Sequence, residues 1–185
     1  MPSAADRIAL FIDGANLQAA ARAIGLDIDY GKLLEEFGGR GNLLRATYYT
    51  VIIEDQEYSS VRPPVDWLEY NGYTVVTRII EDPFDDRSRN KARSNIRVRL
   101  AVDALELAEY IDHMVLFSGD GDFRALVEAM QRHGVYVAIV STVASRPSMV
   151  AAELRRQADA FTDLTELQSR IRRDPPGQRA PRDLR

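Results

Sequence analysis

The sequence contains no cysteine. This absence excludes disulfides, thiolate metal sites and a cysteine nucleophile, and it favours the reducing cytoplasm. Long hydrophobic runs are also missing, because no stretch approaches the roughly 20 apolar residues that a membrane span needs. The run Ile8–Ile12 is too short for the core of a signal peptide. We therefore expect a cytoplasmic protein with no membrane segment.

Several familiar motifs are absent as well. Neither G-x-x-x-x-G-K-[ST] nor G-x-G-x-x-G occurs, which argues against the glycine-rich nucleotide-binding loops that these motifs form. The segment Asp120-Gly121-Asp122 begins like an EF-hand loop, but Gln131 stands where that loop needs a glutamate. A phosphatase with an aspartate nucleophile does not fit either, because Ala15 replaces the second aspartate after Asp13.

The chain has 185 residues, of which 45% are hydrophobic and 28% charged. This composition indicates one globular domain, which we place at residues 1–169. The net charge of −4 hides a basic tail, since residues 170–185 hold six arginines and two aspartates among prolines. We expect this tail to be disordered, either as a solvated end or as an electrostatic arm for nucleic acid.

A second basic stretch lies inside the domain and holds no acidic residue. It either belongs to a loop that neutralises itself against the preceding acids or holds the phosphate backbone of RNA. Its members are Arg87, Arg89, Lys91, Arg93, Arg97 and Arg99.

Strand and helix patterns alternate along the chain, which predicts an α/β fold: a three-layer α/β/α sandwich with a mostly parallel central sheet. The expected strands are 8–12, 43–53, 73–80, 114–118, 135–141 and 160–161. The expected helices are 17–24, 30–37, 61–70, 95–110, 123–133, 149–158 and 164–173. We expect Asn95 and Ser148 to cap their helices, and residues 81–94 to form a long loop.

Carboxylates follow two of the expected strands directly. Asp13 ends the first strand, with Asn16 three residues further on, and Asp120 and Asp122 follow the fourth strand. Each cluster alone could be a turn or a helix cap. If the two strands are neighbours, however, three carboxylates meet at one sheet edge, where a hard cation such as Mg²⁺ or Mn²⁺ would offset their repulsion.

Three ordered motifs resemble a known family. They are Phe11-Ile12-Asp13-Gly14-Ala15-Asn16-Leu17, the helical segment Leu100–Leu105, and Val115–Phe123 with its Ser-Gly-Asp-Gly-Asp-Phe. A further segment, Leu154–Phe161, resembles the closing segment of the same family. Together they are similar to NYN domains, the LabA-like branch of the PIN-like nuclease superfamily, over about residues 7–167. The resemblance implies a PIN-like fold and a metal-dependent ribonuclease.

By this resemblance the metal ligands are Asp13, Asp120 and Asp122, and the catalytic set adds Asn16 and Asp103. Asn16 would orient a water molecule or a ligand carboxylate. The resemblance also implies RNA, expected to be single-stranded, as the substrate, and it allows pairing with a second copy of the chain.

One position departs from the family pattern. Arg97, which we expect in the first turn of the middle helix, replaces a usual acidic residue, and Arg99 follows two positions later. An arginine cannot ligate Mg²⁺, and its charge competes with a metal. Asp103 therefore has two interpretations, a member of the metal site or the partner of Arg99 in an i,i+4 pair.

Two functions remain open from the sequence. The first, which we favour, is a metal-dependent endoribonuclease that cleaves RNA phosphodiesters through the strand-end carboxylates. The alternative is a catalytically weakened or inactive domain that keeps the fold without full metal occupancy and acts as an RNA-binding or protein-interaction module.

Overall fold

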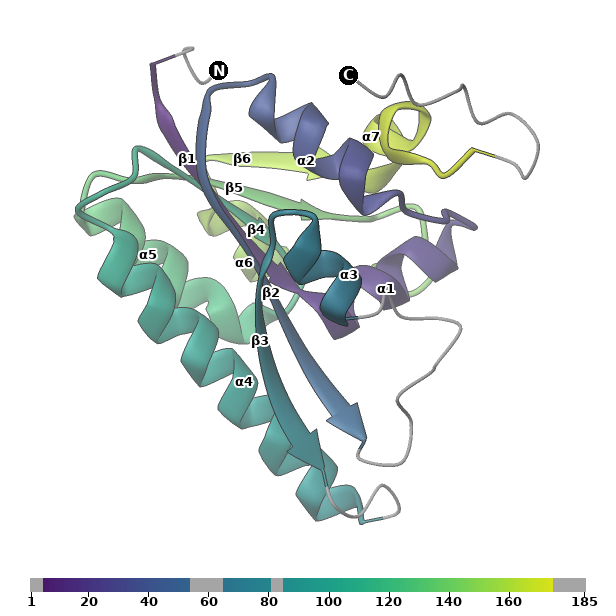
Figure 1. Ribbon diagram of the computed structural model, residues 1–185. Helices are drawn as coiled ribbons and strands as arrows, with labels where there is room; N and C mark the ends of the chain where they lie inside the picture. The colour runs from purple at the N-terminus through teal and green to yellow at the C-terminus, as the bar shows by residue number, and fades with distance from the viewer. Residues whose placement is uncertain (1–4, 54–64, 81–84, 175–185) are drawn as a thin grey trace.

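The computed structural model describes residues 5–53, 65–80 and 85–174 (Figure 1). The strands are β1 (Arg7–Asp13), β2 (Asn42–Ile53), β3 (Thr74–Ile80), β4 (His113–Phe117), β5 (Tyr136–Ser141) and β6 (Ala160–Asp163). The helices are α1 (Gly14–Ala23), α2 (Tyr30–Gly38), α3 (Val65–Tyr70), α4 (Asp86–Leu107), α5 (Arg124–Arg132), α6 (Ala152–Gln157) and α7 (Leu164–Ile171), with the short 3₁₀ helix η1 (Gly121–Phe123) before α5.

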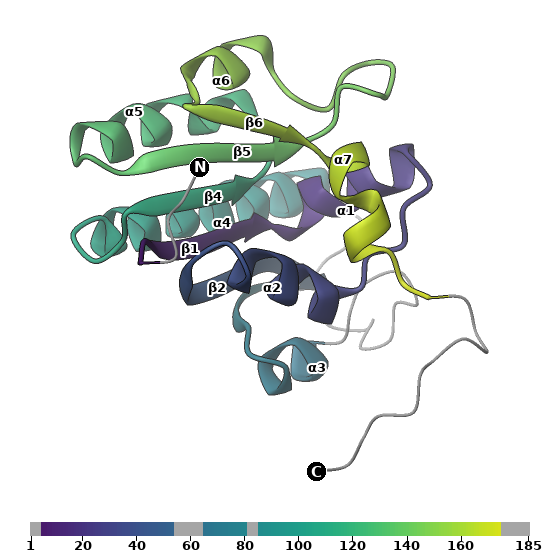
Figure 2. The ribbon, with the colours of Figure 1, turned by 90° about the horizontal axis from the view of Figure 1, so that it is seen from above.

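The strands form one sheet in the order β3-β2-β1-β4-β5-β6, and every neighbouring pair is parallel. Figure 2 shows β6, β5, β4, β1 and β2 side by side in this order. Helices cover both faces of the sheet, which confirms the predicted α/β/α sandwich.

The central strand β1 supplies side chains to both cores, because successive residues of a strand point to opposite faces. Ile8, Leu10 and Ile12 pack with α1, α2, α3 and α7. Ala9 and Phe11 pack with α4, α5 and α6 on the other face. This two-sided burial explains why the first strand is a continuous apolar run rather than an alternating one.

The prediction of a long loop at 81–94 is wrong from Asp86 onward, because α4 already begins there. The cap is Asp85, whose carboxylate accepts the backbone N–H groups of Arg87 and Ser88, and not Asn95. Ala92 and Ile96 are buried and continue the apolar spacing of Leu100 and Ala104. Because most of the other residues in this segment are charged, the regular spacing of its apolar residues was not recognised in the sequence. Residues 81–84 lie outside the described part of the chain.

The helix expected from Met149 is also shorter than predicted. Ser148 bonds locally, its hydroxyl accepting from the N–H of Val150 at 3.3 Å, and α6 begins only at Ala152. Residues 61–64 of the expected third helix lie outside the described residues.

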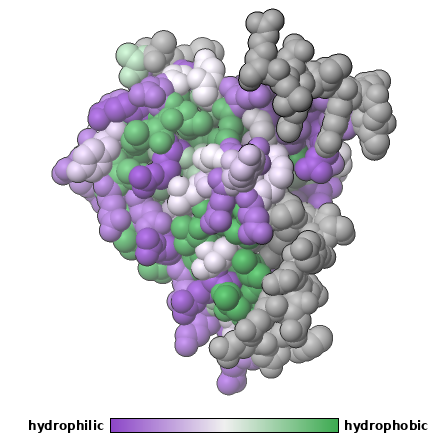
Figure 3. Space-filling model, in the orientation of Figure 1, coloured by the Kyte–Doolittle hydropathy of each residue, from purple (hydrophilic) through white to green (hydrophobic). Residues whose placement is uncertain are grey.

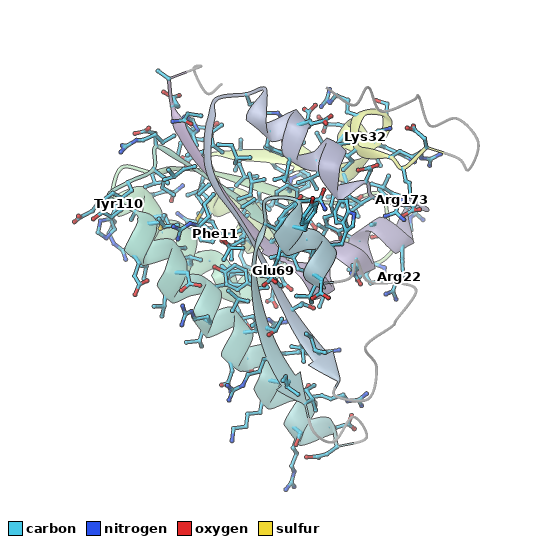
Figure 4. The ribbon with its side chains drawn as sticks, in the orientation of Figure 1. Phe11, Arg22, Lys32, Glu69, Tyr110 and Arg173 are labelled. Carbon is cyan, nitrogen blue, oxygen red and sulfur yellow. The ribbon has the colours of Figure 1, made fainter. Side chains whose placement is uncertain are left out.

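The first residues of the expected tail belong to the folded body. α7 continues to Ile171, and Arg172 pairs with Ile28 in an isolated β-bridge. Lys32 forms an ion pair with Asp174 at 2.7 Å, and the guanidinium of Arg173 donates to the carbonyl oxygen of Ile28 at 3.4 Å; Figure 4 labels Lys32 and Arg173. Residues 175–185 lie outside the described part of the chain.

Within the described residues, no helix has the length and apolarity needed to cross a membrane. On the face seen in Figure 3, hydrophilic residues surround and separate the hydrophobic patches.

Candidate functional site

The sheet order reverses between β1 and β4. The chain builds β1, β2 and β3 outward in one direction and then returns to place β4 on the free side of β1. In parallel sheets, the connections that leave two such strands diverge and open a crevice at the carboxyl edge. Asp13 ends β1 and the segment Ser118–Asp122 follows β4, so the two carboxylate clusters meet at this edge as predicted.

Asp13 is the most enclosed carboxylate of the site, with 7% of its surface exposed. One carboxylate oxygen accepts the N–H of Asn16 at 3.3 Å, which caps α1, and the other accepts the hydroxyl of Ser118 at 3.2 Å. Burial raises the pKa of Asp13 above its ordinary value, although the Asn16 amide, the charge of Arg97 and the Ser118 hydroxyl oppose this shift. A raised pKa makes this carboxylate a stronger base than an exposed aspartate.

The segment after β4 is fixed by short hydrogen bonds. The side-chain oxygen of Asn16 accepts the N–H of Gly119 at 3.0 Å, and the hydroxyl of Ser118 accepts the N–H of Asp120 at 3.2 Å. A Cβ on Gly119 would stand 1.8 Å from the carbonyl oxygen of Met149, so only glycine fits. Asn16 thus holds the two strand ends together. Sequence reasoning did not single out Ser118, although the Ser-Gly-Asp-Gly-Asp motif contains it.

Arg97 crosses from α4 to the two remaining carboxylates. Its Nη2 lies 2.5 Å from an oxygen of Asp120, and its Nη1 lies 3.4 Å from an oxygen of Asp122. Asp120 is mostly buried and Asp122 largely exposed. The expectation that Arg97 stands in the first turn of its helix is wrong, because α4 begins eleven residues earlier at Asp86. Its guanidinium nevertheless reaches the site.

Asp103 is held apart from this cluster by its own partners. Arg99 Nε lies 2.7 Å from one carboxylate oxygen, and the hydroxyl of Tyr49 donates to the other at 3.0 Å. Burial and the neighbouring carboxylate raise the pKa of Tyr49, which keeps this hydroxyl protonated as a donor. No contact among the described residues joins Asp103 to Asp13 or Asp120. The i,i+4 pair with Arg99 is therefore the interpretation that this geometry supports.

The residues as arranged do not fit a divalent metal ion. Arg97 already forms ion pairs with Asp120 and Asp122, so its charge occupies the carboxylates that would ligate the metal. Across the described ranges, no three His, Cys, Asp or Glu side chains are grouped so that they could hold a metal. An arginine thus supplies the positive charge at the position where the sequence predicts Mg²⁺ or Mn²⁺.

The basic residues expected to bind RNA lie on a helix rather than in a loop. Arg97 and Arg99 pair with acids, and Arg89 pairs with Asp86. The other three make no ion pair with a described residue; they are Arg87, Lys91 and Arg93.

A polar hollow close to η1 adds cations that the sequence analysis missed. Arg124, Glu153, Arg156 and Gln157 line it. It adjoins the segment after β4, since a Cβ on Gly121 would stand 2.7 Å from Glu153 Oε1. No sequence signal marked this hollow, because α5 and α6 bring its residues together only in the fold.

Comparison with known proteins agrees with this architecture. The family model of the NYN domain matches residues 7–165. Low amplitude and bright protein LabA from Synechococcus elongatus is 33% identical over 169 residues, which cover 89% of this chain and 87% of the relative. A crystal structure of a protein of unknown function from Vibrio parahaemolyticus superposes with a TM-score of 0.68 at 25% identity, covering 89% of this chain and 96% of that one. The chain therefore belongs to the NYN domain family, whose members are generally nucleases.

Proposed function

We propose that this protein is a ribonuclease that cleaves phosphodiester bonds of single-stranded RNA at the carboxyl edge between β1 and β4. The observation that carries the proposal is the meeting of Asp13 and Asp120 at the reversal of the sheet, linked by Ser118. Membership of a family of nucleases supports it. The absence of cysteine supports a place in the cytoplasm.

The residues of the chain have separate roles in this proposal. Asp13 accepts a proton from the attacking water, since its raised pKa suits a general base. Asn16 and Ser118 fix the end of β1 and the segment after β4 relative to each other through their hydrogen bonds. Arg97 pairs with Asp120 and Asp122 and so restricts access to these carboxylates. Dependence on Mg²⁺ or Mn²⁺ is implied by family resemblance, but no step is assigned to a metal because the present arrangement does not fit one.

The ion pair between Arg97 and Asp120 favours a second candidate. A site whose carboxylates are neutralised from within could bind RNA, or another protein, without cleaving anything. The fold and the basic residues would then serve recognition alone.

The test is cleavage of end-labelled single-stranded RNA in Mn²⁺ by the wild type, Asp13→Asn and Asp120→Asn. We expect each substitution to reduce the rate by about a hundredfold or more. Asp112→Asn is the matched control, because Asp112 is an exposed carboxylate at the opposite edge of the sheet, before β4. Equal rates for all four proteins would refute the proposal, whereas RNA binding without cleavage by the wild type would favour the second candidate.

A further inference from the structure

The polar hollow beside η1 holds charged side chains that the proposed cleavage does not use. It is lined by Arg124 at the start of α5 and by Glu153, Arg156 and Gln157 of α6, and its volume is about 320 Å³. Ligand pockets occupy roughly 300–1,000 Å³, so the hollow admits a small group such as one nucleobase or one phosphate. One wall is fixed, because Gln157 Nε2 donates to Gln131 Oε1 at 2.8 Å.

The hollow lies directly beside the carboxylates of the candidate site. Gly121 stands between the two aspartates that follow β4, and a Cβ on it would stand 2.7 Å from Glu153 Oε1. The N–H of Ala151, just before α6, donates to the carbonyl oxygen of Gly119 at 2.8 Å and fixes α6 against the same segment. A strand of RNA with a phosphodiester at the carboxyl edge therefore brings a neighbouring nucleotide to the hollow.

The charged groups of the hollow are open to a ligand. Glu153 and Arg156 are exposed, and neither makes an ion pair with a described residue. Among the described residues, Arg124 pairs only with Glu128, one turn further along α5, at 2.7 Å. Exposed pairs of this kind stabilise a protein by no more than about 1 kcal/mol, so Arg124 can exchange Glu128 for a ligand.

The carboxylate of Glu153 decides what the hollow can hold. Arginines alone would favour a phosphate, but a carboxylate in the same hollow repels a phosphate and needs hydrogen-bond donors. Nucleobases carry donors and acceptors on one planar edge. Guanine has two adjacent donors, N1–H and the N2 amino group, for the two oxygens of a carboxylate, and its O6 and N7 accept from a guanidinium. Among the four bases of RNA only guanine has this pair of donors, so the lining favours guanine.

We propose that the hollow binds an unpaired guanine of the RNA strand, next to the phosphodiester at the carboxyl edge. The inference rests on the proposed function, because it takes single-stranded RNA as the ligand. Glu153 accepts the N1–H and N2–H groups of the base, and Arg156 donates to O6 and N7. Unpaired bases present these edges freely. The hollow thus gives the protein a sequence preference that contacts to phosphate alone do not supply.

The first test measures the affinity of the full chain for RNA by fluorescence anisotropy in EDTA, which removes the Mn²⁺ used for cleavage. The probes are short uridine oligonucleotides with a single central guanosine, inosine or adenosine. The wild type should bind the guanosine probe at least about tenfold more tightly than the other two. Inosine is the critical comparison, because it lacks only the N2 amino group of guanosine.

The second test connects the preference to the hollow. Glu153→Gln should remove the preference for guanosine over inosine, because an amide has a single acceptor oxygen. Glu106→Gln is its matched control, since Glu106 is exposed in the last turn of α4, at the opposite edge of the sheet. Arg156→Ala should reduce the preference for guanosine over adenosine. Arg155→Ala should preserve it, because the Arg155 guanidinium stacks on Phe161, 4.6 Å from the ring centroid.

Three results would overturn the proposal. They are a wild type that binds the three probes equally or not at all, a preference over inosine that survives Glu153→Gln, and an Arg155→Ala variant that loses the preference as Arg156→Ala does. If Glu153→Gln binds every probe more tightly, the hollow holds a phosphate and not a base. Cleavage of RNA without the preference would refute this assignment alone, whereas the preference without cleavage would refute only the ribonuclease.

Discussion

At the scale of single residues, Arg97 decides the character of the candidate site. Its guanidinium lies 2.5 Å from Asp120 and also contacts Asp122, so two carboxylates that would repel each other are neutralised from within the chain. A cation in this position disfavours a second cation nearby. In the structure the site is therefore closed by Arg97.

Removal of this charge should expose the carboxylates to a metal ion. We expect Arg97→Ala to bind Mn²⁺ at least about tenfold more tightly than the wild type, which corresponds to about 1.4 kcal/mol. Isothermal titration calorimetry measures the difference. Arg99→Ala, which frees only Asp103, should not change the affinity. Equal Mn²⁺ affinity of Arg97→Ala and wild type would show that Arg97 does not compete with a metal.

The pair of Arg7 and Asp112 makes a small pH-dependent contribution to stability. Arg7 donates to both oxygens of Asp112 at 3.0 Å and, with its own backbone N–H, lowers the pKa of that carboxyl to about 2. Asp112 is more basic in the unfolded chain, with a pKa near 3.9. The contribution is therefore complete above about pH 4 and disappears as the pH falls towards 2.

Asp112→Asn should accordingly lower the free energy of unfolding by roughly 0.5–1 kcal/mol at pH 7, since the pair is exposed. Urea denaturation at pH 7, 5, 4 and 3 measures the difference between variant and wild type. It should stay constant from pH 7 to 5 and shrink below pH 4. A difference that grows on acidification would contradict this assignment.

At the scale of elements, carboxylates at strand ends serve two purposes in this fold. Asp163 ends β6 and resembles Asp13 in position, but it is fully used as a structural acceptor. It accepts hydrogen bonds from Thr142, from Val143 and twice from Thr165, and it caps α7. Although burial opposes the shift, these donors lower its pKa.

Replacement of this acceptor should destabilise the domain without affecting the candidate site. We expect Asp163→Asn to lower the free energy of unfolding by about 1–3 kcal/mol, because donors that were satisfied in the folded state lose a charged partner. Glu166→Gln should cost less than about 0.5 kcal/mol, because glutamine keeps the oxygen that accepts the Asp163 N–H. If Asp163→Asn proved as stable as the wild type by urea denaturation, the hydrogen bonds around this carboxylate would contribute nothing.

The elements that could be predicted from the sequence are those with uninterrupted local patterns. Apolar runs marked β1, β2 and β5, and glycines marked the ends of the helices that precede β2 and β5. The start of α4 could not be predicted, because charged residues mask the spacing of Ala92 and Ile96. The cap of α6 was missed because Ser148 can form either a cap or a local turn, and only packing selects between them.

At the scale of the whole molecule, the sheet order creates the candidate site. Asp13 and Asp120 are 107 residues apart, and only the adjacency of β1 and β4 joins them. The sequence predicted which carboxylates follow strands, but the pairing of strands is a long-range property. The same packing brings Arg97 from the middle of α4 to the carboxylates and forms the hollow beside η1. Neither feature could be predicted from the local sequence.

The proposed function can be tested by the rate of single-stranded RNA cleavage in Mn²⁺ by Arg97→Ala and by the double variant of Arg97→Ala with Asp13→Asn. In this proposal the strand-end carboxylates form the reactive site and Arg97 closes it. Arg97→Ala should therefore cleave RNA faster than the wild type, and Asp13→Asn in the same background should remove that activity. Cleavage that is not accelerated by Arg97→Ala, or that survives the loss of Asp13, would contradict it.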